Sequence, residues 1–177
     1  MPIRYSLARR AARDLLKEAG IKVPPVPVEK LAKVAGARIR FAPFGEGELS
    51  GMIIQQGNGV AVIGVNSLHP KVRQRFTIAH ELGHLVLHPK QPMHVDKEFL
   101  PVRFRDRRSS AGDDAVEVEA NQFAAALLMP EDFVRAEVDR SWGGESFDEE
   151  NIKELAERFQ VSIAAMTVRL TALRLVE

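Results

Sequence analysis

Two histidines four residues apart, with a glutamate directly after the first, form the stretch best suited to chemistry. They are His80, Glu81 and His84. On a helix each residue turns by about 100°, so residues four apart point in nearly the same direction and both imidazoles can bind one metal ion. Glu81 is turned away from the shared direction, and it can reach a water molecule on that ion. The spacing predicts two metal ligands, His80 and His84, and a catalytic general base, Glu81.

The residue types of this motif fit hydrolysis. Neutral imidazole is a good zinc ligand, and two imidazoles with one carboxylate leave a fourth tetrahedral position for water. Zinc lowers the pKa of bound water to about 7, and a nearby carboxylate can take its proton and later pass it to a leaving amine. His88 lies a further turn along and next to Pro89. We therefore expect His88 to be a helix-end residue favoured by the helix dipole, and not a ligand.

The third ligand must come from another part of the chain. The acidic and histidine candidates are His94, Asp96, Glu98, Asp113, Asp114, Glu117 and Glu119. Glu117 begins a stripe of one helix that continues through Ala120, Asn121, Ala124 and Leu128, and its small residues allow close packing on the histidine helix. Asn121 can accept a hydrogen bond from a ligating histidine and so orient it. We select Glu117 as the third metal ligand and Asn121 as the orienting residue, with Glu119, on a different face, as the alternative.

Composition restricts the remaining possibilities. The 177 residues include no cysteine, which excludes a cysteine zinc finger, a cysteine nucleophile and a disulfide framework. A formal net charge of +1 gives no global field for nucleic acid or a membrane surface. The sequence carries no signal-peptide core and no apolar run of bilayer length. We expect a soluble, cytoplasmic protein without membrane association.

Hydrophobic periodicity and turn residues predict an α+β fold. We expect a strand at 37–44, a hairpin with strands 52–54 and 60–63 around the turn 57–59, and a long surface loop at 90–114. The predicted helices span 5–19, 28–36, about 70–89, 115–129 and 131–140, and two further helices lie within 151–173 around a turn at 160–162. Ser162 is a suitable N-cap for the last helix.

The paired motifs "RFTIAHELGHLVLH" and "EVEANQFAAALLMP" resemble the ImmA/IrrE family of metallo-endopeptidases, and the resemblance covers nearly the whole chain. It implies a gluzincin-like zinc site in which His80, His84 and Glu117 are the ligands and Glu81 is the base. We expect a compact zincin-like metallopeptidase domain over residues 1–140, with a small antiparallel sheet on the two ligand-bearing helices. Residues 141–177 are expected to form a helix-turn-helix-like subdomain packed on that core.

The resemblance also implies a partner. Anti-repressor members of the family cut a DNA-binding repressor in phage-like, mobile-element or stress-response settings. We therefore predict a zinc-dependent endopeptidase, with manganese or iron as other metals that suit the ligands, whose substrate is a helix-turn-helix repressor. A peptide could add to an edge strand near 51–64. His94, Arg103, Arg105 and Tyr5 are candidates for stabilising the oxyanion.

Two other functions compete with the enzyme. In one, the protein is a binding module that sequesters a repressor, and the metal is structural; three ligands plus an acid favour catalysis over this reading, because structural zinc sites are closed by four. In the other, the C-terminal helices read DNA. Met166, Thr167, Arg169 and Arg174 of the second helix provide too few basic and amide side chains for this, so we expect no direct nucleic-acid binding.

Overall fold

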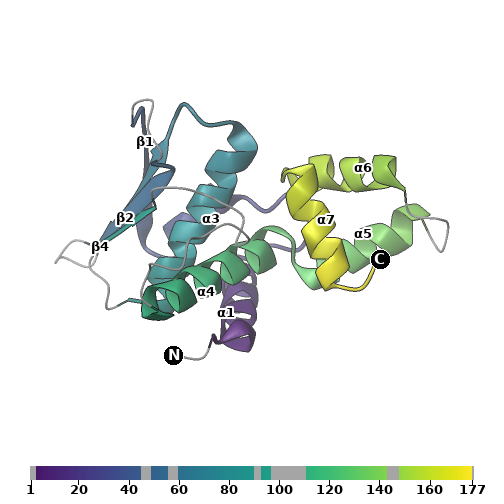
Figure 1. The fold of residues 1–177 in the computed structure, drawn as a ribbon, viewed down its shortest axis with the longest axis horizontal. Coiled ribbons are helices and arrows are strands. Elements are labelled where there is room, and N and C mark those ends of the chain that lie inside the picture. Colours follow the sequence, from purple (N-terminus) through teal and green to yellow (C-terminus); the bar gives the residue numbers. More distant parts are fainter. Residues whose placement is uncertain are drawn as a thin grey trace.

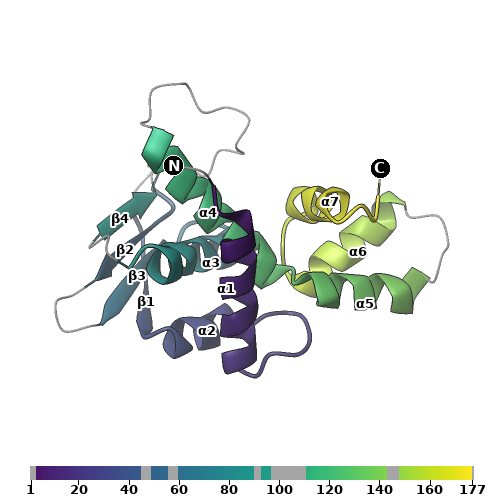
Figure 2. The ribbon, with the colours of Figure 1, turned by 90° about the horizontal axis from the view of Figure 1, so that it is seen from below.

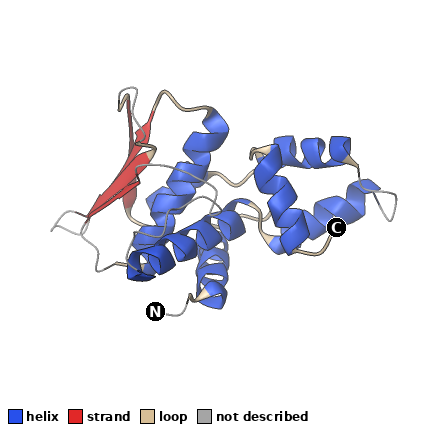
Figure 3. Ribbon diagram, viewed as in Figure 1, coloured by secondary structure: helices blue, strands red, loops and turns tan. Residues whose placement is uncertain are grey.

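A mixed sheet and several packed helices make up the fold, which confirms the predicted α+β class. The computed structural model describes residues 3–44, 49–55, 60–89, 93–96, 111–142 and 148–176. The sheet lies on one side of the molecule, and helix α3 packs against it (Figures 1 and 3). Helices α4 and α1 lie beyond α3, so the helix with the two histidines is in the middle of this part of the structure.

The boundaries of the elements agree closely with the sequence expectations over most of the chain. The helices are α1 (Tyr5–Glu18), α2 (Val28–Val34), α3 (Lys71–Leu87), α4 (Ala111–Leu128), α5 (Glu131–Trp142), α6 (Glu149–Phe159) and α7 (Ile163–Ala172). The strands are β1 (Ala37–Ala42), β2 (Gly51–Gln55), β3 (Ala61–Asn66) and β4 (Met93–Asp96). The turn predicted at 57–59 lies outside the described residues.

The strand order of the sheet is β1-β3-β2-β4. The predicted hairpin is confirmed, because β2 and β3 pair antiparallel, and β4 pairs antiparallel with β2. The β1–β3 pair is parallel, so the expectation of an antiparallel sheet was wrong for this pair. The chain reverses direction between β1 and β2 and again between β2 and β3, so β1 and β3 run the same way. They pair because β3 lies between β1 and β2 in the sheet.

The same strand order corrects the predicted docking strand. Both β2 and β3 have a partner on each side, so a segment near 51–64 is not an edge of the sheet. The outer strands of the described sheet are β1 and β4. The loop predicted at 90–114 was also partly wrong, since it contains β4 at 93–96 and the start of α4 at 111. Pairing with β2 gives the short β4 segment its strand conformation.

Helical periodicity places the apolar face of α1 against the core. Ala8, Ala12, Leu15 and Leu16 are buried, and they follow the spacing of one helix face. Gly20 ends the helix at φ +68°, with the Ile21 amide bonded to the Leu16 carbonyl. This is the left-handed C-terminal turn for which glycine is preferred. The stop directs the chain toward α2, so α1 is free to pack across α4 and α3.

Helices α5, α6 and α7 lie together at the end of the molecule opposite the sheet (Figure 1). Ser162 caps α7 as predicted, because its hydroxyl accepts the Ala165 amide hydrogen. The helices are tied to the rest by Arg169, which donates to the Met129 carbonyl, and by Arg75, which donates to the carbonyls of Gln160 and Val26. The apolar residues of both parts form one continuous core. The domain division at residues 140 and 141 stays a prediction.

Among the described helices, none combines the length and the apolar character that a bilayer span requires.

Candidate metal centre

The two helices that carry the predicted ligands approach each other closely at Gly83. A Cβ atom added to Gly83 would stand 3.0 Å from both the Cα and the carbonyl oxygen of Ala120 on α4. Helix axes usually pack 8–10 Å apart, and side chains at the contact set the distance. Glycine opposite alanine removes that spacer, as the small residues of the α4 stripe predicted. This close contact brings His80 and His84 on α3 within reach of Glu117 on α4.

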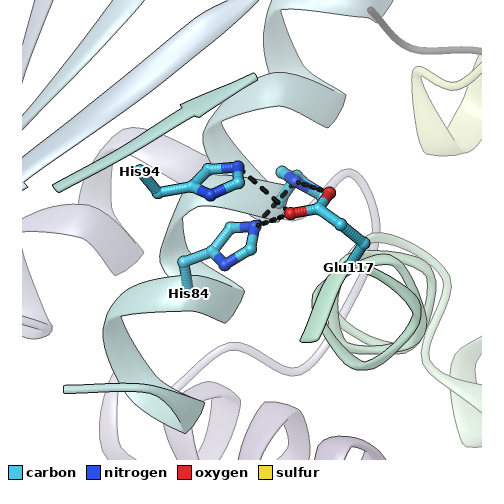
Figure 4. Close-up of side chains that lie close together, drawn as sticks. His84, His94 and Glu117 are labelled. Atoms are coloured by element: carbon cyan, nitrogen blue, oxygen red, sulfur yellow. Dashed lines mark hydrogen bonds and ion pairs between the residues drawn. The ribbon is translucent and has the colours of Figure 1, made fainter. Parts of the chain in front are cut away.

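The predicted ligands converge in space, and a histidine from β4 joins them (Figure 4). The Nε2 atoms of His80 and His84 are 2.9 Å apart. Oxygen atoms of Glu117 lie 3.4 Å from His80 Nε2 and 3.3 Å from His84 Nε2. His94 Nε2 lies 3.3 Å from Glu117 Oε1. One atom from each of these four side chains falls within 4.8 Å of every other.

The separations from Glu117 are close to those between the ligand atoms of a zinc site. For metal–nitrogen and metal–oxygen distances near 2.0–2.1 Å, tetrahedral geometry separates neighbouring ligand atoms by about 3.3 Å. The three separations from the two Glu117 oxygen atoms are 3.3–3.4 Å, and the 2.9 Å between the Nε2 atoms of His80 and His84 is shorter. Three imidazoles and one carboxylate are also a donor set that zinc accepts. The residues present therefore fit a zinc ion, and His80, His84, Glu117 and His94 are the side chains that could hold it.

The environment of the two helix histidines favours the form that binds metal. His80 Nδ1 is 2.9 Å from the side-chain oxygen of Asn121, which accepts its hydrogen and leaves the Nε2 lone pair directed at the group. Burial, and then the neighbouring His80, His94 and His88, lower the pKa of His84 far below its usual range. His84 is thus neutral near pH 7, and a neutral imidazole is the metal-ligating form. The contact predicted for Asn121 is present.

Glu81 lies in the interior of the protein beside this group. Its side chain is fully buried, on the same turn of α3 as His80. Gly51 of β2 packs beside it, and a Cβ there would stand 2.3 Å from the methyl group of Thr77, one turn before Glu81 on α3. A carboxylate is costly to bury, so its retention at this position fits a chemical purpose. The catalytic role of Glu81 remains a prediction.

Glu119, the alternative third ligand, faces away from the histidine pair. Its carboxylate accepts hydrogen bonds from the Arg4 backbone amide at 2.8 Å and from the Arg4 guanidinium at 3.0 and 2.7 Å. His88 lies just beyond the end of α3, and its Nε2 is 3.4 Å from Glu119 Oε2. His88 is thus a helix-end residue that contacts the Arg4–Glu119 pair, and burial lowers its pKa.

His94 was one of several candidates in the sequence, and three ligands were predicted where the structure gathers four. No sequence signal separates His94 from the acidic residues around it, because its position depends on the pairing of β4 with β2. Glu98, Arg103 and Arg105 lie outside the described residues, as do the side chains of Asp96, Asp113 and Asp114. Tyr5 is the first residue of α1 and is 43% exposed.

Comparison with known families identifies the chain. The family model of the IrrE N-terminal-like domain, a peptidase family, matches residues 32–171. This protein belongs to that family. The resemblance predicted from the paired motifs is therefore confirmed, and all four candidate ligands lie within the matched range.

Two curated proteins are similar to this chain. The chain is 30% identical to the radiation response metalloprotease IrrE of Deinococcus radiodurans over 171 residues, which is 96% of this chain and 48% of that protein. It is 38% identical over 67 residues to the uncharacterized immunity region protein 2 of Bacillus phage phi105, which is 38% of this chain and 37% of that protein. The chain thus spans about half the length, or less, of these curated relatives.

A solved Mycobacterium tuberculosis transcriptional regulator has the same fold, with a TM-score of 0.61 at 17% identity. The match covers 96% of this chain and 47% of that one. At this identity the likeness concerns the fold alone.

Proposed function

We propose that this protein is a zinc-dependent endopeptidase that cleaves a helix-turn-helix transcriptional repressor and so relieves repression. One observation carries the proposal. His80 and His84 of α3 converge with Glu117 of α4, and the buried carboxylate of Glu81 lies on the same turn as His80. Membership of a peptidase family supports the same chemistry.

The roles of the side chains follow from their positions. His80, His84 and Glu117 would hold the ion, which supplies when bound a Lewis acid that polarises a carbonyl group and acidifies water. Glu81 accepts the proton of the attacking water and returns it to the amide nitrogen that leaves. Asn121 holds the ring of His80 through Nδ1, which fixes the direction of Nε2. Burial of Glu81 keeps bulk water from competing for its carboxylate.

The decisive experiment separates catalysis from metal binding. Glu81→Gln keeps the size of the side chain and removes its basicity, so the variant should retain one metal per chain and lose cleavage by about a thousandfold or more. Glu18→Gln, on the exposed side of α1, is the matched control and should behave as the wild type. Metal content is measured by mass spectrometry of the metal, and cleavage by the fragments formed. Cleavage by the Glu81→Gln variant at the wild-type rate would rule out this mechanism.

The choice of substrate rests on the anti-repressor members that the motifs resemble and on the partial likeness to a phage immunity region protein. The test is to mix the purified protein with a helix-turn-helix repressor from the same organism, chosen first from any that neighbouring genes encode. We expect two fragments with wild-type protein and none with Glu81→Gln, and mass spectrometry of the fragments gives the cleaved bond. A repressor that stays intact with metal-loaded wild-type protein would contradict the proposed substrate.

A second candidate function has one observation in its favour. With His94, the group can supply four protein ligands, and a closed set of four is typical of structural zinc sites. A protein with such a site would bind and sequester the repressor without cutting it. In that case wild-type protein and Glu81→Gln would release the repressor from DNA equally well, and neither would produce fragments.

The C-terminal helices give little support to direct DNA binding. Of the side chains considered for base contacts, Met166 is fully buried and Arg169 is 8% exposed. Arg169 is committed to the Met129 carbonyl. A recognition helix needs such side chains free in the major groove, so the structure favours a packing role for α7.

A further inference from the structure

His94 differs from the other members of the group in how it is held. It lies on β4, a strand of four residues that pairs with β2 and forms one outer edge of the described sheet. His80, His84 and Glu117 lie on helices of 17 and 18 residues, which meet at the Gly83–Ala120 contact. The side chain of His94 is 18% exposed, whereas those of His80 and His84 are 1% and 2% exposed.

The Nε2 atom of His94 lies within reach of the candidate ligand group. This atom is as far from Glu117 Oε1 as His84 Nε2 is, 3.3 Å in both cases. The ring stacks on His84, with centroids 3.6 Å apart and planes inclined by 20°, and Figure 4 shows both rings directed at the Glu117 carboxylate. Because the two planes are nearly parallel, the in-plane lone pairs of the two rings do not meet at one point, so the His94 ring must turn for both to bind one ion. A possible ligand atom of His94 lies within 4.8 Å of those of His80, His84 and Glu117.

We infer that His94 is a fourth, displaceable metal ligand that closes the coordination shell of the resting protein. The inference rests on the proposed metal centre. Four protein ligands leave no position for water, whereas a hydrolytic site needs one. The shell opens when His94 withdraws. His94 is the ligand that can do so at least cost, because a shift of the edge strand leaves the contact between α3 and α4 intact.

Cobalt(II) in place of zinc tests the closed shell directly, because its visible spectrum reports the number and type of ligands. Azide is the probe of an open position. We expect azide to leave the wild-type spectrum unchanged and to change that of His94→Ala at millimolar concentration. His94→Ala should still bind one metal per chain, with zinc affinity weaker by about tenfold or more in competition with a chromophoric chelator. His88→Ala removes a neighbouring histidine outside the group and should match the wild type in both measurements.

Several outcomes would overturn the inference. One is an azide response and a zinc affinity that are the same in wild type and His94→Ala. Another is a His94→Ala variant that loses only cleavage, since His94 would then act on the substrate and not on the metal. Circular dichroism checks folding, and His94→Gln carries the same comparison if the alanine variant does not fold.

The proposed function fails in a different way. If Glu81→Gln cleaved the substrate as fast as the wild type, the proposed metallopeptidase would be refuted whatever the role of His94. The same holds if His84→Ala bound zinc with full affinity.

Discussion

Glu117 and Glu119 lie two residues apart on the same helix and serve different surroundings. Glu117 faces three imidazoles from α3 and β4, whereas Glu119 faces the guanidinium and backbone amide of Arg4. Both side chains are largely covered, with 13% and 4% of their surfaces exposed. Burial alone therefore does not distinguish a metal ligand from a structural carboxylate.

The distinction lies in the charge of the neighbours. A guanidinium is always charged and offers several donors, so it satisfies the Glu119 carboxylate and lowers its pKa through their hydrogen bonds. His84, which burial keeps neutral, brings a lone pair to Glu117. A carboxylate surrounded by lone pairs attracts a cation, and one surrounded by N–H groups does not need it. A rotation of about 200° about the helix axis therefore places Glu117 at the candidate metal group and Glu119 at the ion pair with Arg4.

The strongest test exchanges the two carboxylates for alanine. Glu117→Ala should weaken zinc binding by more than about 100-fold, because it removes a ligand that contacts both helix histidines. Glu119→Ala should bind zinc as the wild type does. Zinc affinity is measured by competition with a chelator, and the opposite ranking of the two variants would show that the wrong carboxylate was selected.

A smaller effect is expected from the residue that orients His80. Asn121→Ala removes the acceptor for the His80 Nδ1 hydrogen and should weaken zinc binding by about 10- to 100-fold. Asn121→Asp keeps an acceptor at that place and should retain most of the affinity. If both variants bound zinc equally weakly, the loss of affinity would not come from the hydrogen bond between Asn121 and His80.

The Arg4–Glu119 pair should instead affect the free energy of unfolding. Glu119→Gln removes the negative charge that accepts hydrogen bonds of 2.7 and 3.0 Å from the Arg4 guanidinium. The substitution should lower the free energy of unfolding by about 1–2 kcal/mol, and solvent screens part of the effect because Arg4 is 38% exposed. Glu131→Gln, which breaks the exposed pair with Arg135 on α5, is the control and should cost about 0.5 kcal/mol or less. Equal midpoints in urea denaturation for the two variants would contradict a special role of the Arg4 pair.

The two regions should also respond to acid in different pH ranges when the metal is removed. The pKa of His84 is lowered from 6.5, so the unfolded chain binds the proton more readily and stability falls as the pH drops below about 6.5. The pKa of Glu119 is lowered from 4.5, so its contribution is present above that pH and is lost below it. Urea denaturation of the metal-free protein across pH should show both steps. Glu119→Gln should remove only the lower one.

The separation of Glu117 from Glu119 could be predicted from the sequence, because it follows from helical periodicity alone. The same holds for α1, α3 and the Ser162 cap, which depend on residues close to one another in the chain. The contact between Asn121 and His80 followed once two helices were assumed to pack through their small residues. Local patterns therefore predicted three members of the candidate metal group.

The fourth member, His94, depends on contacts between distant segments. The sequence "MHVD" is short and follows Pro92, so it has little strand signal of its own, and β2 supplies the pairing that defines it. The parallel pairing of β1 with β3 has the same origin, since strand order is decided by the packing of the whole sheet. The early start of α4 was missed because Gly112 and Asp113 are poor interior helix residues, although acidic residues suit a helix N-terminus.

The contact of Gly83 with Ala120 places a limit on size at two positions that carry no chemical group. A larger side chain at either position would act as a wedge, moving the two histidines and the glutamate apart while leaving each of them in the sequence. Such a chain would still carry the complete motif and would fail to bind metal. A search for functional members of this family by motif alone would then accept it, so the smallness of residues 83 and 120 belongs to the signature of the site as much as its ligands do.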